Sequence, residues 1–156
     1  MDDLARLTAD LVAIDSVNPS LVAGGAGERE IARTVAAWLE EAGLEVEVLE
    51  PVLGRPSVVG VARGRGGGRS LMLNAHLDTV GVAGMEAPFA PRIEGERLYG
   101  RGSLDMKGSL AAIMLAGREA AKRGLRGDVI VAAVADEEAG SIGTEAVLAG
   151  RAAVTG

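Results

Sequence analysis

Residues that can bind a metal ion occur at three places in this sequence. The segment NAHLDTV contains His76 and Asp78, GRGSLDMKG contains Asp105, and VADEEAGS contains Asp136, Glu137 and Glu138. His76 and Asp78 are two residues apart on an extended segment, so their side chains point to the same side, where the carboxylate can orient the imidazole. The adjacent carboxylates of the third segment repel one another, and a divalent cation offsets that repulsion. Because the chain has no cysteine, imidazole and carboxylate are its available zinc ligands.

Each of these places follows a predicted strand or lies at a predicted turn. Apolar residues at intervals of three and four predict helices over residues 3–14, 28–42, 106–123 and part of 141–150. Alternating and continuous apolar patterns predict strands over residues 44–51, 57–63, 70–78 and 128–135. The first of these strands suits a sheet edge and the last a buried central position. A hairpin is expected around residues 92–100, and the loop GRGGG is expected to join the strands at 57–63 and 70–78 as a hairpin.

Strands that alternate with helices at this spacing predict an α/β fold. We expect three layers, with a mixed or mostly parallel sheet covered by helices on both faces. In such sheets ligands bind beyond the carboxyl ends of the strands. The three metal-capable segments are therefore expected to converge in one cleft.

Composition narrows the possible functions. The 156 residues suit one domain, and the net charge of −6 argues against nucleic-acid binding, which depends on Lys and Arg. No apolar run is long enough for a membrane span, and the first residues lack the basic start and apolar stretch of a secretory signal. With no cysteine for disulfides, a cytoplasmic location is the expectation.

Simpler explanations exist for each motif taken alone. Asp105 could cap the helix that follows it, and Glu137 and Glu138 could be a solvated helix start. A lone histidine such as His76 is usually structural or exposed. The GRGGG loop lacks the spacing of a phosphate-binding loop, which leaves a flexible loop as its best interpretation. The metal interpretation depends on the three motifs occurring together.

HLDTV, GRGSLDMKG and ADEEAGSIGT, in this order, resemble the signature of the zinc metallopeptidase family that includes acetylornithine deacetylase, succinyl-diaminopimelate desuccinylase and several carboxypeptidases. The resemblance implies that His76 and Glu138 each bind one zinc ion and that Asp105 bridges the two, with Co²⁺ as a possible substitute. Asp78 would orient His76, and Glu137 would be the general base. The implied activity is hydrolysis of linear amide bonds in N-acyl amino acids or short peptides.

Members of that family are more than twice as long as this chain. Residues 1–156 would correspond to the amino-terminal portion of the catalytic domain, an incomplete zinc-peptidase-like domain without the lid and dimerisation domain, a later acidic ligand and a second histidine. Each metal would then keep two protein ligands, whereas catalytic zinc usually has three. We therefore expect little or no turnover. The alternative is a noncatalytic, truncated remnant that acts as a binding module, and an uncovered sheet edge would favour a homo-oligomer.

Overall fold

A four-stranded mixed sheet forms the centre of the molecule. The computed structural model describes residues 2–152. Its central strands are β1 (Glu45–Leu49), β2 (Ser57–Ala62), β3 (Leu71–His76) and β6 (Val129–Val134). They lie in the order β1-β2-β6-β3, and β2 is antiparallel to β1 and β6, whereas β3 and β6 are parallel. The mixed sheet confirms the predicted α/β class, with β1 at an edge and β6 in a central position.

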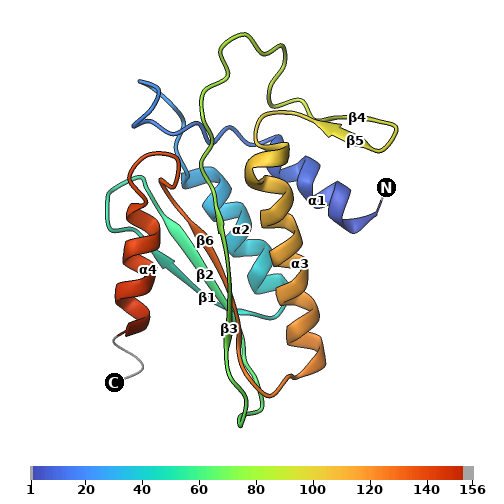
Figure 1. Ribbon diagram of the computed structural model, residues 1–156, viewed down its shortest axis with the longest axis vertical. Coiled ribbons are helices and arrows are strands. Elements are labelled where there is room, and N and C mark those ends of the chain that lie inside the picture. Colours follow the sequence, from blue (N-terminus) through green and yellow to red (C-terminus); the bar gives the residue numbers. More distant parts are fainter. Residues whose placement is uncertain (1, 153–156) are drawn as a thin grey trace.

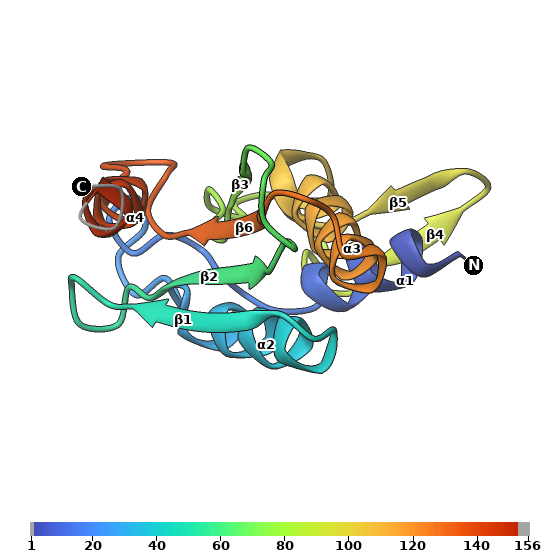
Figure 2. The ribbon, with the colours of Figure 1, turned by 90° about the horizontal axis from the view of Figure 1, so that it is seen from below.

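Helices cover both faces of this sheet. They are α1 (Asp3–Val12), α2 (Arg29–Glu41), α3 (Gly108–Arg123) and α4 (Ile142–Ala152). α2 and α3 lie against one face, with α1 packed on α3 (Figure 1). Figure 2 shows α4 on the opposite face, where Val147 packs against Val59, Val61 and Val134. The predicted three-layer arrangement is confirmed, and none of the helices in the described part of the chain is long and apolar enough to cross a membrane.

The apolar spacing of α1 and α2 explains how the larger core forms. The apolar cluster between the sheet and these helices contains Leu7 and Leu11 of α1 and Ile31 and Val35 of α2. Fully burying one such side chain contributes about 1.5–3 kcal/mol. The amphipathic pattern therefore both predicts these helices and fixes the face that each presents to the core.

The predicted hairpin between β2 and β3 is wrong, because β6 lies between these two strands. Successive residues of β6 point alternately into the apolar clusters on the two faces of the sheet. With β2 and β3 paired on either side, the apolar run of β6 lies in the middle of the sheet. The GRGGG loop instead contacts the turn that precedes β6. A Cβ on Gly64 would lie 2.6 Å from the carbonyl carbon of Gly127, and one on Gly68 would lie 2.6 Å from the nitrogen of Gly127. These glycines allow the two backbones to approach closely.

The segment between β3 and α3 has more structure than the sequence patterns indicate. The predicted hairpin is present as β4 (Arg92–Glu94) and β5 (Arg97–Tyr99), which pair in antiparallel fashion. The helix predicted from residue 106 begins at Gly108, because a kinked turn, η1 (Ser103–Lys107), with non-helical backbone angles at Asp105 and Met106, precedes it. Asp105 has φ −122° and ψ 101° within that turn, and no side-chain hydrogen bond caps α3.

Candidate metal centre

The parallel strands β3 and β6 end side by side, and the three predicted site segments lie beyond these ends. His76, the last residue of β3, is the register partner of Val134, the last residue of β6. The chain leaves β3 toward Asp78 and leaves β6 toward Glu137 and Glu138. The turn η1, which carries Asp105, contacts β3. The topology thus places all three segments at one edge of the sheet.

The structure brings the three predicted metal ligands together. One ligand atom from each of His76, Asp105 and Glu138 lies within 4.8 Å of the others. Nε2 of His76 is 3.0 Å from Oδ1 of Asp105 and 3.7 Å from Oε2 of Glu137. His76 is 4% exposed, whereas the side chain of Asp105 is 74% exposed, so the cluster has a buried floor and a solvent-facing side.

Contacts to Asp78 fix the orientation of the His76 ring. Nδ1 of His76 lies 2.9 Å from the backbone oxygen of Asp78 and 3.5 Å from its carboxylate. A backbone carbonyl only accepts hydrogen bonds, so Nδ1 carries a hydrogen, and Nε2 is the ring nitrogen that faces Asp105 and that a metal ion would bind. The group nearest to Nδ1 is thus the backbone oxygen of Asp78. That the carboxylate of Asp78 also orients the ring stays a prediction.

The carboxylate of Asp78 holds the segment that carries the two glutamates. It accepts hydrogen bonds from the backbone N–H of Glu137 at 3.1 Å and of Glu138 at 3.1 Å. It also accepts one from the side-chain amide of Asn18 at 2.7 Å. Burial raises the pKa of Asp78, but these hydrogen bonds and the one to His76 outweigh burial and lower it. Asp78 therefore stays ionised and fixes the backbone beside His76.

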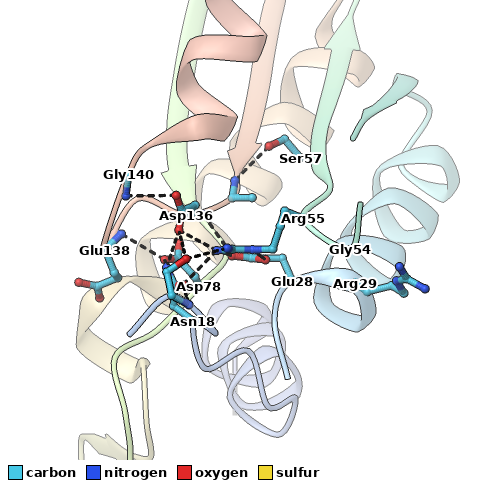
Figure 3. A network of polar contacts seen from close by, with 12 residues as sticks. Asn18, Glu28, Arg29, Gly54, Arg55, Ser57, Asp78, Asp136, Glu138 and Gly140 are labelled. Carbon is cyan, nitrogen blue, oxygen red and sulfur yellow. Dashed lines mark hydrogen bonds and ion pairs between the residues drawn. The ribbon is translucent and has the colours of Figure 1, made fainter. Parts of the chain in front are cut away.

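Four residues to which the sequence patterns assign no role surround this centre: Asn18, Glu28, Arg55 and Asp136. Figure 3 shows them in one network of polar contacts. All four are buried, at 0% to 8% exposure. Asn18 and Arg55 each precede a proline in a loop, and Glu28 comes at the start of a helix, so the sequence marks them as solvated turn residues. Asp136 directly precedes the two glutamates in the sequence, but the family resemblance implies no metal role for it.

The surroundings of His76 favour a positive charge. Burial by itself lowers the pKa of the imidazole, but hydrogen bonds to Asp78 and Asp105 raise it by more, to about 9. The pKa of Glu138 is raised above its ordinary value, mainly by burial. The nearby charge of His76 lowers this pKa, whereas the charges of Asp105 and Asp78 raise it. A divalent cation at this point would replace the proton on His76 and relieve the repulsion between carboxylates. One imidazole and two carboxylates also make a donor set that suits zinc.

Comparison with known proteins agrees with this geometry. Residues 72–155 match the family described as Peptidase family M20/M25/M40. That stretch is more than half of the chain and includes all five residues of the predicted site. The chain belongs to this family.

Individual relatives extend the M20 match toward the amino terminus. A succinyl-diaminopimelate desuccinylase of Xanthomonas oryzae pv. oryzae is 37% identical over 148 residues, covering 91% of this chain and 37% of that protein. An N-formyl-4-amino-5-aminomethyl-2-methylpyrimidine deformylase of Bacillus subtilis is 36% identical over 119 residues, covering 70% of this chain and 28% of that protein. The crystal structure of an M20 family metallo-carboxypeptidase from Sulfolobus solfataricus has a TM-score of 0.79 at 25% identity, covering 95% of this chain and 34% of that one. This M20 chain thus spans roughly a third of the length of these relatives.

Proposed function

We propose that this chain carries the larger part of a two-metal, zinc-type centre of a hydrolase that acts on linear amide bonds. The single observation behind the proposal is the cluster of His76, Asp105 and Glu138, whose ligand atoms lie within 4.8 Å of one another. These residues come from three separate segments of the sequence, and the family resemblance implies that each of them is a metal ligand. The substrates proposed are N-acyl amino acids or short peptides, which is consistent with the desuccinylase, deformylase and carboxypeptidase named among the relatives.

The proposed roles are those that the family resemblance implies, and the positions of the residues are consistent with them. His76 and Glu138 would each bind one metal ion, and Asp105 would bridge the pair. Bound zinc would make water more acidic and polarise the carbonyl of the substrate. Glu137 has a half-exposed side chain, 3.7 Å from Nε2 of His76, where it can take a proton from water and return it to the leaving amine.

The number of ligands limits the activity proposed for this chain. With Asp105 shared between two metals, His76 and Glu138 supply the only other ligands of the predicted set. Catalytic zinc usually has three protein ligands, so each metal would be held weakly. We therefore propose weak metal binding and low turnover for the 156-residue chain. A small-molecule substrate, a cytoplasmic location and the absence of a nucleic-acid or membrane partner complete the proposal.

The proposed function is tested by assaying hydrolysis of N-succinyl and N-acetyl amino acids with zinc or cobalt added. We expect metal-dependent turnover far below that of a full-length relative. Glu137→Gln should abolish this turnover without loss of metal affinity, whereas Glu86→Gln, an exposed control, should leave it unchanged. Turnover that survives removal of metal by a chelator would contradict the metal-dependent mechanism. Turnover equal to that of the relative would contradict the proposed impairment.

A further inference from the structure

Arg55 lies outside the metal cluster, in the loop between β1 and β2, yet its contacts lead directly to the segment that carries Glu137 and Glu138. We propose that Arg55 is a positioning residue: by binding Asp136, it fixes the turn from which both glutamates project. This inference rests on the proposed function, because Glu138 is there a metal ligand and Glu137 the proton carrier.

The guanidinium of Arg55 is held by partners on all sides. Nε and Nη2 donate to the carboxylate of Glu28 at 2.6 and 2.7 Å, which is a two-point ion pair. Nη2 also donates to Oδ1 of Asp136 at 2.8 Å, and it shares one of its two hydrogens with the side-chain oxygen of Asn18 at 3.1 Å. Nη1 donates to Ser20 Oγ at 3.1 Å. The planar fork of arginine suits this geometry, and the single ammonium group of lysine cannot reproduce it.

Asp136 needs such support because its backbone has a left-handed conformation, with φ 63°. A residue other than glycine adopts this conformation at a cost, and it persists only where the surroundings hold it. The side chain of Asp136 binds Arg55 and Asn18 through Oδ1 and the backbone N–H of Gly140 through Oδ2. Its own backbone N–H donates to Glu28 at 3.2 Å. Arg55 and its partner Glu28 thus bind the residue at which the chain turns away from β6.

Asn18 joins this turn to the ring of His76 through Asp78. Its side-chain amide nitrogen donates to Asp78 at 2.7 Å and to Asp136 at 3.0 Å (Figure 3). Asp78 in turn binds the backbone N–H groups of Glu137 and Glu138. The segment 136–138 is therefore held at Asp136 by Arg55 and at the two glutamates by Asp78, with Asn18 between them.

The charges of the network also favour a cation at the metal cluster. Arg55 supplies one positive charge, whereas the buried carboxylates of Glu28, Asp136 and Asp78 supply three negative ones. Negative charge that is buried and not fully balanced favours a cation nearby, and His76, which lies against Asp78, is at the predicted metal position. Groups that hold metal ligands in this way usually alter metal affinity about 10- to 100-fold when they are changed.

The test is Arg55→Lys in the metal-free 156-residue chain, followed by amide hydrogen exchange. We expect exchange over residues 136–141 to become about tenfold faster, while exchange over 129–134 in β6 changes little. Cobalt affinity, read from the visible absorption of the bound ion, is expected to fall about 10- to 100-fold. Equal acceleration over both segments, as a general loss of stability would produce, would overturn the inference.

Two further variants keep the test decisive. Arg118→Lys alters another arginine–aspartate pair, the 3.0 Å contact with Asp3, and should leave exchange over residues 136–141 and cobalt affinity unchanged. If Arg55→Lys does not fold, Asp136→Asn replaces it, because asparagine tolerates the left-handed backbone but loses the charge that Arg55 binds. Asp136→Asn should then show the same selective acceleration, and its absence would overturn the inference.

The outcomes separate this inference from the proposed function. Cobalt affinity that falls in His76→Ala but not in Arg55→Lys would overturn the role of Arg55 alone. Equal cobalt affinity in the wild type and His76→Ala would overturn both the metal centre and the positioning of its ligands. A fall in both variants, with selective exchange at residues 136–141, is the result that supports the inference.

Discussion

At the scale of single residues, Asp78 makes contacts that its motif alone does not reveal. Its carboxylate binds the backbone N–H groups of Glu137 and Glu138 and the amide of Asn18, and its backbone oxygen binds His76. It is 1% exposed, so water cannot replace these partners easily. An ionised carboxylate that accepts several hydrogen bonds in a buried position contributes to stability as well as to the geometry of the site.

Asp78→Asn is therefore expected to lower the free energy of unfolding by about 1–3 kcal/mol, because its NH₂ group must face a hydrogen-bond donor. Urea denaturation with a chelator present measures this effect without any contribution from bound metal. Asp10→Asn, at an exposed position on α1, is the matched control and should leave the midpoint unchanged. A wild-type midpoint for Asp78→Asn would show that these hydrogen bonds contribute little.

The sequence could predict the residues of the site better than the contacts that hold them. His76, Asp105 and Glu138 occur in distinctive motifs, and the structure places them together. Arg55 could not be found in the same way, because its partners Glu28 and Asp136 are 27 and 81 residues away. A charged residue in a proline-containing loop is usually solvated, and only the folded chain shows that this one is buried.

At the scale of elements, α3 lies close to the sheet because of a glycine. A Cβ on Gly117 would lie 2.7 Å from Cγ2 of Val131 in β6 and 3.2 Å from Cδ2 of Leu44. The γ-methyl of a buried valine cannot move aside without disturbing its neighbours. The glycine therefore sets the distance between α3 and β6, although it lowers the helix propensity of its segment.

Alanine substitutions at two helical glycines should act in opposite directions. Gly117→Ala gains about 1 kcal/mol of helix propensity but overpacks the core at a cost of about 1–3 kcal/mol, so a net loss of stability is expected. Gly150→Ala, in α4, adds a Cβ with no atom within 4 Å and should stabilise the chain by up to about 1 kcal/mol. Chemical denaturation of both variants checks the signs, and a stabilised Gly117→Ala would contradict the close packing described here.

The elements themselves were largely predictable, whereas their pairing was not. Periodic apolar residues identify α1, α2, β1 and β6 because each pattern is local. The insertion of β6 between β2 and β3 joins segments far apart in sequence, and a glycine-rich connection between two strands resembles a hairpin loop when read locally. The kinked turn η1 has no apolar period that would mark it, so the sequence pattern places the start of α3 too early.

At the scale of the whole molecule, the sheet has two strands without a further neighbour among the described residues. These are β1 and β3, at the opposite ends of the strand order. β1 alternates its apolar residues with Glu45 and Glu47, and charges of this kind discourage pairing with another chain. β3 begins with Leu71, which is 55% exposed, and its apolar residues lack such protection. β3 is therefore the edge at which self-association is expected.

Self-association through β3 should appear as a concentration-dependent rise in mass. Leu71→Lys is expected to reduce it, because a lysine on an exposed edge opposes strand pairing. Leu53→Lys removes a side chain that is 87% exposed in the loop after β1, and it controls for the loss of apolar surface alone. Sedimentation equilibrium measures the mass of each variant. An equal effect of the two substitutions, or a wild-type chain that stays monomeric at high concentration, would contradict association through β3.

The most direct test of the metal centre is isothermal titration of zinc into the wild-type chain and His76→Ala. His76 is the only histidine in the sequence, so the protein must carry no histidine tag. We expect zinc affinity to fall at least about tenfold in His76→Ala, while Glu96→Gln, at an exposed position in the β4–β5 turn, binds zinc as the wild type does. Equal zinc affinity in the wild type and His76→Ala, with both chains folded, would contradict a metal centre that includes His76.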